Sequence, residues 1–183
     1  LFRSPHFHCV ALDLPFHGSA KNHPVQDFDD TCAYVAQHIQ SAVGNHPYFL
    51  VGYSLGGRIA LYYALCSQQD KYNLQGLIIE GGNLGLTNEA DKKVRWENDM
   101  FWAQRFRHET ATSVLNDWYQ QPIFAHLTED QRKALIEKRQ ANCGDNIAKM
   151  LLATSLAKQP DLRPYVKNSP YPIAYFRSEE RRV

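Results

Sequence analysis

Several features are missing from this 183-residue sequence, and each absence argues against a class of protein. No apolar run approaches the roughly 18 residues of a membrane span, so we expect no membrane association. Lys and Arg number 20 against 19 Asp and Glu, and a net charge of +1 gives no basic surface for nucleic acid. The four cysteines lack C-x-x-C spacing, which argues against a zinc site or a disulfide framework. A reduced, cytoplasmic protein without metal or cofactor is the simplest interpretation.

The order of apolar segments predicts one α/β domain. Strand-like runs at 7–13, 48–51 and 77–80 are separated by helical spacing over 28–43 and after Leu55, with Asp27 as a helix start and Gly44 as its end. Strands that alternate with helices favour right-handed crossovers and a parallel sheet buried on both faces. In such sheets function is found at the carboxyl ends of the strands.

The stretch from Tyr48 to Leu61 carries the strongest chemical signal. A buried strand runs into Gly52-Tyr53-Ser54-Leu55-Gly56, a G-x-S-x-G motif, and a helix begins at about Leu55. This pattern is typical of a nucleophile elbow, where a sharp turn exposes a serine and flanking side chains would collide. The amide of Leu55, at the helix N-terminus, would donate to an oxyanion. Arg58 lies about one turn beyond Ser54, although most arginines are simply solvated.

From about residue 84 to 159 the alternation stops and the pattern becomes helical, at 89–107, 110–119, 128–140 and 146–157. Thr128 and Gln131 form a capping box. We therefore expect a first part of the core at 1–83, a helical cap at 84–160, and a return to the core at 161–183 with a strand near 171–176. The aromatic residues of the cap are expected mainly to pack it together.

Four blocks of the sequence resemble one family. They are Gly52–Arg58, Glu80-Gly81-Gly82, the Asp117-Trp118-Tyr119-Gln120-Gln121-Pro122 block with Ile123 and Phe124, and Thr154–Arg163. Together they resemble the MenH family of α/β-hydrolases, the 2-succinyl-6-hydroxy-2,4-cyclohexadiene-1-carboxylate synthases of menaquinone biosynthesis, from about residue 7 to 176. The resemblance implies an α/β-hydrolase fold with helices on both faces of the sheet and a helical cap.

The same resemblance implies the chemistry. In this family a catalytic triad removes a proton from a cyclohexene polycarboxylate and pyruvate is eliminated. It assigns Ser54 to the triad and the Leu55 amide to the oxyanion hole. The implied substrate-binding residues are Tyr53, Arg58, Arg95, Trp118 and Arg139, and paired guanidinium groups suit a substrate with several carboxylates.

The loop after residue 12 resembles the D-x-P-G-x-G loop of α/β-hydrolases, with Phe16 where glycine is usual. A catalytic Asp13 is one interpretation. We favour a structural role, in which Asp13 fixes the loop by hydrogen bonds to backbone groups, and a structural role for His17 as well.

The sequence departs from the family at both ends. The triad order in α/β-hydrolases is Ser, Asp or Glu, then His, but the last of the eight histidines is His126, inside the expected cap. The family's acid, an aspartate after the last strand, is also missing: this chain has Ser178-Glu179-Glu180-Arg181-Arg182, with an arginine at the expected position. Substitution by Glu179 or Glu180 is the less favoured alternative. Its first strands and His-Gly loop would precede Leu1. We therefore expect a truncated or frame-disrupted, catalytically inactive and poorly stable chain, with Arg177 to Val183 as out-of-frame sequence.

Three functions remain open at this point. The first is a MenH-type lyase, intact or as a remnant. The second is a general carboxylesterase or thioesterase that uses the same serine turn. The third is a non-catalytic binding protein of the α/β-hydrolase kind. Oligomeric state is not predicted.

Overall fold

The computed structural model describes residues 6–176. Glu179, Glu180 and the rest of the tail from Arg177 therefore lie outside the described residues. The strands are β1 (Tyr48–Tyr53), β2 (Leu74–Glu80) and β3 (Ile173–Phe176). The helices, with two 3₁₀ turns, are η1 (Gly18–Ala20), α1 (Phe28–Val43), α2 (Leu55–Leu65), α3 (Glu89–His108), α4 (Ala111–Trp118), η2 (Pro122–Phe124), α5 (Glu129–Arg139), α6 (Gly144–Ala153) and α7 (Arg163–Lys167).

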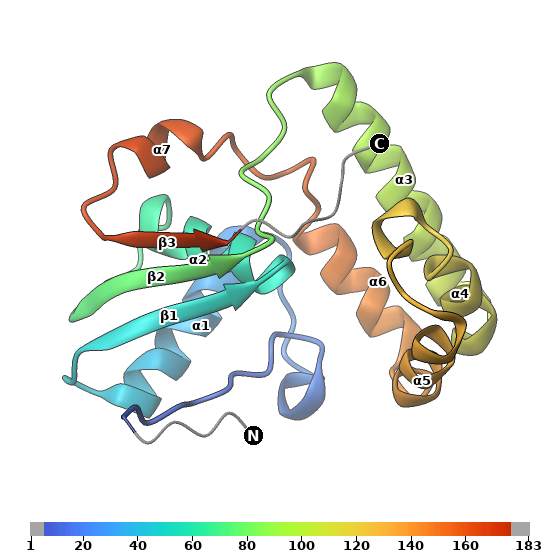
Figure 1. Cartoon of the computed structure of the whole chain (residues 1–183), viewed down its shortest axis with the longest axis horizontal. Helices are drawn as coiled ribbons and strands as arrows, with labels where there is room; N and C mark the ends of the chain where they lie inside the picture. Colours follow the sequence, from blue (N-terminus) through green and yellow to red (C-terminus); the bar gives the residue numbers. More distant parts are fainter. Residues whose placement is uncertain (1–5, 177–183) are drawn as a thin grey trace.

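The strands form a parallel sheet in the order β1-β2-β3, as the alternating sequence predicts. Val51 is in register with Ile78, and Ile78 with Ala174. All three strands therefore end at the same edge, toward which the arrowheads point in Figure 1. The residues that follow the strands, Ser54 and Gly81 among them, meet at this edge.

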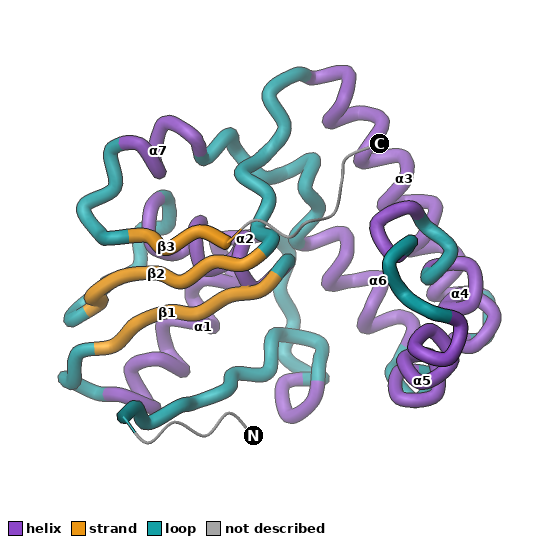
Figure 2. Tube along the Cα trace, in the orientation of Figure 1, coloured by secondary structure: helices purple, strands orange, loops and turns teal. Residues whose placement is uncertain are grey.

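Helices α1 and α2 cover one face of the sheet (Figures 1 and 2). Helix α1 begins and ends where the sequence predicts: the side chain of Asp27 accepts a hydrogen bond from the Asp30 amide, and Gly44 terminates it at φ 54°. Buried Cys32 and Val35 of α1 pack with Ile59 and Tyr63 of α2. This part of the core thus lies between the two helices on one face of the sheet. It holds α2 in place, and the serine turn is at the N-terminus of α2.

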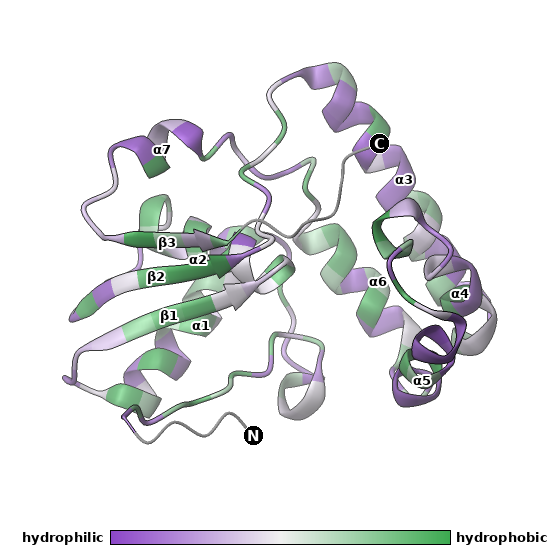
Figure 3. Cartoon of the chain, viewed as in Figure 1, coloured by the Kyte–Doolittle hydropathy of each residue, from purple (hydrophilic) through white to green (hydrophobic). Residues whose placement is uncertain are grey.

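The other face of the sheet is exposed in the described part of the chain. Val51 is 69% exposed and Phe49 51%, so the expectation that the strand at 48–51 is buried on both faces is wrong here. The alternating burial of β1 is the pattern of a sheet covered on one face only. In Figure 3 the middle of β2 and much of β3 are coloured hydrophobic.

The strand predicted at 7–13 is also not formed. Residues 7–12 have no strand assignment, and Phe7 is 65% and Val10 46% exposed. Isolated apolar residues form a strand only where a neighbouring strand accepts their backbone hydrogen bonds. Figure 1 shows this segment apart from β1, and it is not part of the sheet formed by β1, β2 and β3.

Helices α3 to α6 pack on one another beside the carboxyl ends of the strands (Figure 1). Trp102, Phe106, Val114, Leu115 and Tyr119 form their shared interior. Thr128 and Gln131 make the predicted capping box at the start of α5. Helix α6 begins two residues before and ends four residues before the predicted 146–157, and Thr154 is its C-cap. None of the described helices is long and apolar enough to cross a membrane.

Candidate active site at the turn between β1 and α2

Ser54 occupies a strained turn between β1 and α2. Its φ of 49° and ψ of −113° lie outside the regions that non-glycine residues usually adopt, and its side chain is exposed. The Ser54 amide donates to the Glu80 carbonyl at 2.8 Å, and its carbonyl accepts from the Arg58 amide at 3.0 Å. These two bonds join the turn to β2 and to α2, so the neighbouring elements hold the strain.

The glycines around Ser54 are not equally constrained. A Cβ atom on Gly52 would lie 2.5 Å from the Gly56 carbonyl oxygen, so only glycine fits there. On Gly57 it would lie 3.3 Å from the Cα atom of Gly82, which lets the loop after β2 approach the turn. Gly56 has open space at this position. The expectation that both motif glycines avoid a collision is therefore right for Gly52 and wrong for Gly56.

Tyr53 and Leu55 flank the serine. Tyr53 ends β1 and is 63% exposed. Leu55 is the first residue of α2, and an amide at this position has no acceptor within its own helix. The amide therefore belongs to the positive end of the helix and is suited to donate to a developing negative charge.

Arg58 is partly buried one turn beyond Ser54. Its guanidinium donates to the carbonyl of Thr154 at 2.9 Å and to the side-chain oxygen of Gln159 at 3.3 Å. Removal from water, together with the charge of Arg95, lowers the pKa of Arg58 to about 10, and Asp99 partly opposes this shift. Arg58 therefore remains positively charged at neutral pH and does not lie on a solvated surface.

Arg95 lies on α3 and is electrostatically coupled to Arg58. Its Nε donates to Asp99 Oδ1 at 2.8 Å. The Asp99 side chain is 1% exposed, and its other oxygen accepts from the Ser155 hydroxyl at 2.7 Å. Two guanidinium groups and one carboxylate thus share this region, which has a net positive charge.

Arg139 and Trp118 are bound within the cap. The Arg139 guanidinium donates to the hydroxyl of Tyr119, and Trp118 packs against Trp102 with ring centroids 5.0 Å apart. The structure therefore brings Arg58 and Arg95 together but links Arg139 to neither of them. The role of Arg139 and Trp118 in binding stays a prediction.

Asp13 and His17 have the structural roles that the sequence analysis favours. Asp13 Oδ2 accepts from the amide and from the hydroxyl of Ser19, each at 2.9 Å. His17 Nδ1 lies 2.9 Å from the carbonyl oxygen of Pro15. Both side chains hold the loop around η1, as expected.

Asp99, Ser155 and Gln159 are site neighbours to which the sequence analysis gives no role. The Arg95–Asp99 spacing of four residues on a helix is a usable signal for an ion pair. The contacts of Ser155 and Gln159 join residues 56 to 101 positions apart, and no local pattern predicts them.

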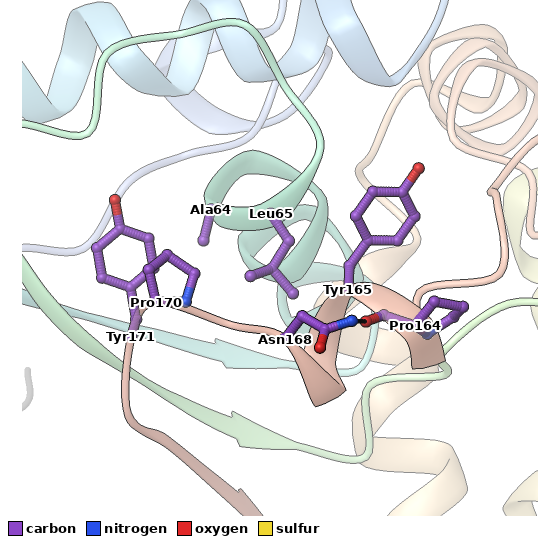
Figure 4. A pocket seen from close by; sticks show the side chains of 7 residues that line it. All are labelled: Ala64, Leu65, Pro164, Tyr165, Asn168, Pro170 and Tyr171. Atoms are coloured by element: carbon purple, nitrogen blue, oxygen red, sulfur yellow. Dashed lines mark hydrogen bonds between the residues drawn. The ribbon is translucent and has the colours of Figure 1, made fainter.

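Two cavities lie away from the serine turn. One of about 330 Å³ is lined by Leu65 of α2 and by Pro164, Tyr165 and Tyr171 around α7 (Figure 4). Another, of about 390 Å³, includes Tyr48, Tyr63 and Asp70. Neither is lined by Ser54, Arg58 or Arg95. The described residues contain no group of three or more His, Cys, Asp or Glu side chains that would hold a metal ion.

A parallel sheet with a serine at the tight turn into the next helix, beside an all-helical cap, defines an α/β-hydrolase. Comparison with known proteins agrees, since a model of the alpha/beta hydrolase fold matches residues 1–173. A Haemophilus influenzae protein named as a 2-succinyl-6-hydroxy-2,4-cyclohexadiene-1-carboxylate synthase is 61% identical over 175 residues, 96% of this chain and 71% of that protein. The chain therefore belongs to the 2-succinyl-6-hydroxy-2,4-cyclohexadiene-1-carboxylate synthase family of α/β-hydrolases.

Two further comparisons point the same way. A synthase of that name from Serratia proteamaculans is 46% identical over 171 residues, 93% of this chain and 66% of that protein. The solved structure of MenH from S. aureus matches with a TM-score of 0.78 and 25% identity, over 90% of this chain and 62% of that one. The chain thus spans between about three-fifths and seven-tenths of the length of these relatives.

Proposed function

We propose that this chain carries the serine turn and the carboxylate-binding arginines of a MenH-type synthase. Such an enzyme eliminates pyruvate from a cyclohexene polycarboxylate and gives 2-succinyl-6-hydroxy-2,4-cyclohexadiene-1-carboxylate. The observation that supports this most is the combination of an exposed, strained Ser54 with Arg58 one turn away and Arg95 coupled to it. The names of the relatives give the product, and the family resemblance implies the elimination of pyruvate.

Ser54 and Leu55 take the central chemical roles in this proposal. The Ser54 hydroxyl acts in a proton relay that removes a proton from the ring carbon of the substrate. The electrons of that bond move into the ring as the carbon–oxygen bond to the leaving group breaks. Pyruvate departs as its enolate, which takes up a proton to become pyruvate. The Leu55 amide, at the N-terminus of α2, stabilises the negative charge that develops on the substrate oxygen.

Arg58 and Arg95 bind carboxylates of the substrate. A guanidinium group fits a carboxylate through two parallel hydrogen bonds, and a site partly removed from water strengthens them. Arg139, Tyr53 and Trp118 belong to the proposed site through the family resemblance. For Arg139 and Trp118 this requires a different arrangement from the contacts they make within the cap.

The 183-residue chain is proposed to be inactive by itself. A serine hydroxyl is a weak base and nucleophile unless a histidine activates it, and that histidine follows the serine and the acid in α/β-hydrolases. In this sequence no histidine follows His126. The proposed place of action is the cytoplasm, with a small-molecule substrate and with no nucleic acid or membrane partner.

The test compares the purified chain with the H. influenzae relative. Pyruvate release is followed by coupling to NADH oxidation, and binding of the diene product is followed by titration calorimetry. We expect product binding with pyruvate release far below that of the relative, and loss of binding in Arg58→Ala. A chain that neither binds the product nor releases pyruvate would contradict the proposal.

Ester cleavage tests the carboxylesterase alternative. Hydrolysis of a p-nitrophenyl ester that survives Arg58→Ala but is lost in Ser54→Ala would favour an esterase over a lyase. Labelling of Ser54 by a fluorophosphonate would show an activated serine, and Ser54→Ala is the control for that reaction.

A further inference from the structure

The buried carboxylate of Asp99 calls for an explanation beyond stability. Its side chain is 1% exposed, yet it lies on α3, a helix whose surface is otherwise rich in charge. Burial of an ion pair usually stabilises a fold little, because the loss of hydration offsets the attraction between the charges. A buried carboxylate paired with a partly exposed guanidinium next to the proposed ligand site is more readily explained by the geometry that it imposes.

The hydrogen bonds of Asp99 use both of its oxygens. One accepts from Arg95 Nε at 2.8 Å, and the other from the Ser155 hydroxyl at 2.7 Å. Ser155 is 0% exposed and follows α6 immediately after Thr154, whose carbonyl holds Arg58. The carboxylate is thus fixed from two sides, by its own helix and by the segment that also holds the second guanidinium group.

The bond to Asp99 uses only the Nε edge of Arg95. Among the described residues, no other hydrogen bond from this guanidinium is found. Its side chain is 36% exposed, so its two terminal nitrogens remain available for a ligand. Anchoring an arginine through Nε limits its rotation and directs the other nitrogens.

The charges of this cluster sum to a net positive charge that an anion would neutralise. Arg58 and Arg95 contribute two positive charges and Asp99 one negative charge, and the charge of Arg95 is close enough to lower the pKa of Arg58. A carboxylate of the ligand would neutralise the remaining charge. An Arg95 that is held in one direction would bind it with less loss of side-chain freedom.

We propose that Asp99 is a positioning residue, fixed by the Ser155 hydroxyl, that directs Arg95 toward a carboxylate of the ligand. This inference rests on the proposed function, because it assumes that the ligand is a polycarboxylate. It adds Asp99 and Ser155 to the residues on which affinity depends, although neither needs to contact the ligand.

The test exploits opposite expectations for Asp99→Asn. If Asp99 only balanced charge, its neutralisation would raise the net positive charge and strengthen binding of an anion. If Asp99 positions Arg95, affinity falls. We expect titration calorimetry of the full chain with the diene product to show a loss of about tenfold or more in Asp99→Asn. Ser155→Ala, which changes no charge, should weaken binding in the same direction by a smaller factor.

Glu109→Gln is the matched control. Glu109, the residue that follows α3, accepts from Arg105 Nε of this helix at 2.6 Å with the same four-residue spacing, but it lies outside this cluster. The affinity of Glu109→Gln for the diene product should stay within about twofold of that of the unmodified chain, because Glu109 bonds Arg105 and Ser113 and not Arg58 or Arg95. Circular dichroism and thermal unfolding of each variant show whether it is folded, and Ser155→Ala is the milder variant should Asp99→Asn not fold.

The outcomes separate this proposal from the proposed function. Equal or tighter product binding in folded Asp99→Asn, with binding still lost in Arg58→Ala, would overturn the positioning role and leave the proposed function intact. Unchanged affinity in Ser155→Ala would likewise contradict the role of the hydroxyl. If the unmodified chain does not bind the product, both proposals fail.

Discussion

A Cβ atom on Gly52 would lie 2.5 Å from the carbonyl oxygen of Gly56, so the end of β1 and the first turn of α2 are in direct backbone contact. Only three residues separate the two glycines, and Ser54 is the middle one. The strain of the serine is maintained because its two flanks pack against each other. The conformation of Ser54 therefore depends on this backbone contact as well as on the serine itself.

The two motif glycines should therefore respond differently to alanine. We expect Gly52→Ala to lower the free energy of unfolding by about 1–3 kcal/mol, because the added methyl group overlaps backbone atoms that have no room to move. Gly56→Ala should be neutral or stabilise the chain by up to about 1 kcal/mol, since its methyl group enters open space within a helix. Denaturant unfolding of both variants measures the difference, and equal effects would contradict the contact.

Much of the fold could be predicted from the sequence because its signals are local. The Asp27 cap, Gly44, the capping box at Thr128 and the helical spacing of the cap each act within a few residues, and all appear in the structure. The strand at 7–13 and the double burial of β1 were wrong for a common reason. Both depend on neighbours in space, which a strand-like composition assumes but does not supply.

The site was predictable only in part. The G-x-S-x-G motif locates Ser54, and the four-residue spacing predicts Arg58 one turn away. The link between Arg58 and Gln159 joins residues 101 positions apart, so it is decided by how the cap meets the core. The grouping of Arg95 with Arg139 rests on resemblance alone and stays a prediction, as does the division at 83 and 160.

The exposed face of the sheet should promote self-association. Phe49, Val51, Tyr53, Ile78 and Phe176 are all exposed, and they belong to three neighbouring strands. Contiguous apolar surface of this kind is rarely left in contact with water. We expect Val51→Lys to reduce association in light scattering across a range of concentrations.

Val94→Lys is the control for that experiment. Val94 is 65% exposed and Val51 69%, so the same substitution is made at matched exposure, but Val94 lies on helix α3. It should leave association unchanged. A similar reduction in both variants would show that added charge, and not the sheet face, controls association.

Cysteine reactivity should separate the core from the surface. All four cysteines are free thiols; Cys9 and Cys143 are exposed and Cys32 is buried in α1. Burial, reinforced by Asp29, raises the pKa of Cys32 to about 12, so almost no reactive thiolate exists at pH 8. We expect iodoacetamide to modify Cys9 and Cys143 rapidly in the native chain, whereas Cys32 reacts only after unfolding in urea. Mass spectrometry of peptides measures this, and native labelling of Cys32 at the rate of Cys9 would contradict the packing of α1.

The bonds of Asp13 give a prediction for acid stability. The amide and hydroxyl of Ser19 donate to this carboxylate and lower its pKa below the usual value of about 3.9. Because the folded state then binds a proton less readily than the unfolded state, Asp13 contributes stability above about pH 4. That contribution is lost as the pH falls through the folded-state pKa.

Asp13→Asn should therefore be less stable than the unmodified chain at pH 7, and the difference should shrink on acidification. At this exposed loop, solvent screening limits the effect to about 1 kcal/mol, or a shift in the unfolding midpoint of about 2–4 °C for a chain of this size. Ser19→Ala removes one of the two donors and should give a smaller difference with the same pH dependence. Calorimetric midpoints between pH 3 and 7 measure both. A gap that widens toward low pH would show that Asp13 acts by some means other than these hydrogen bonds.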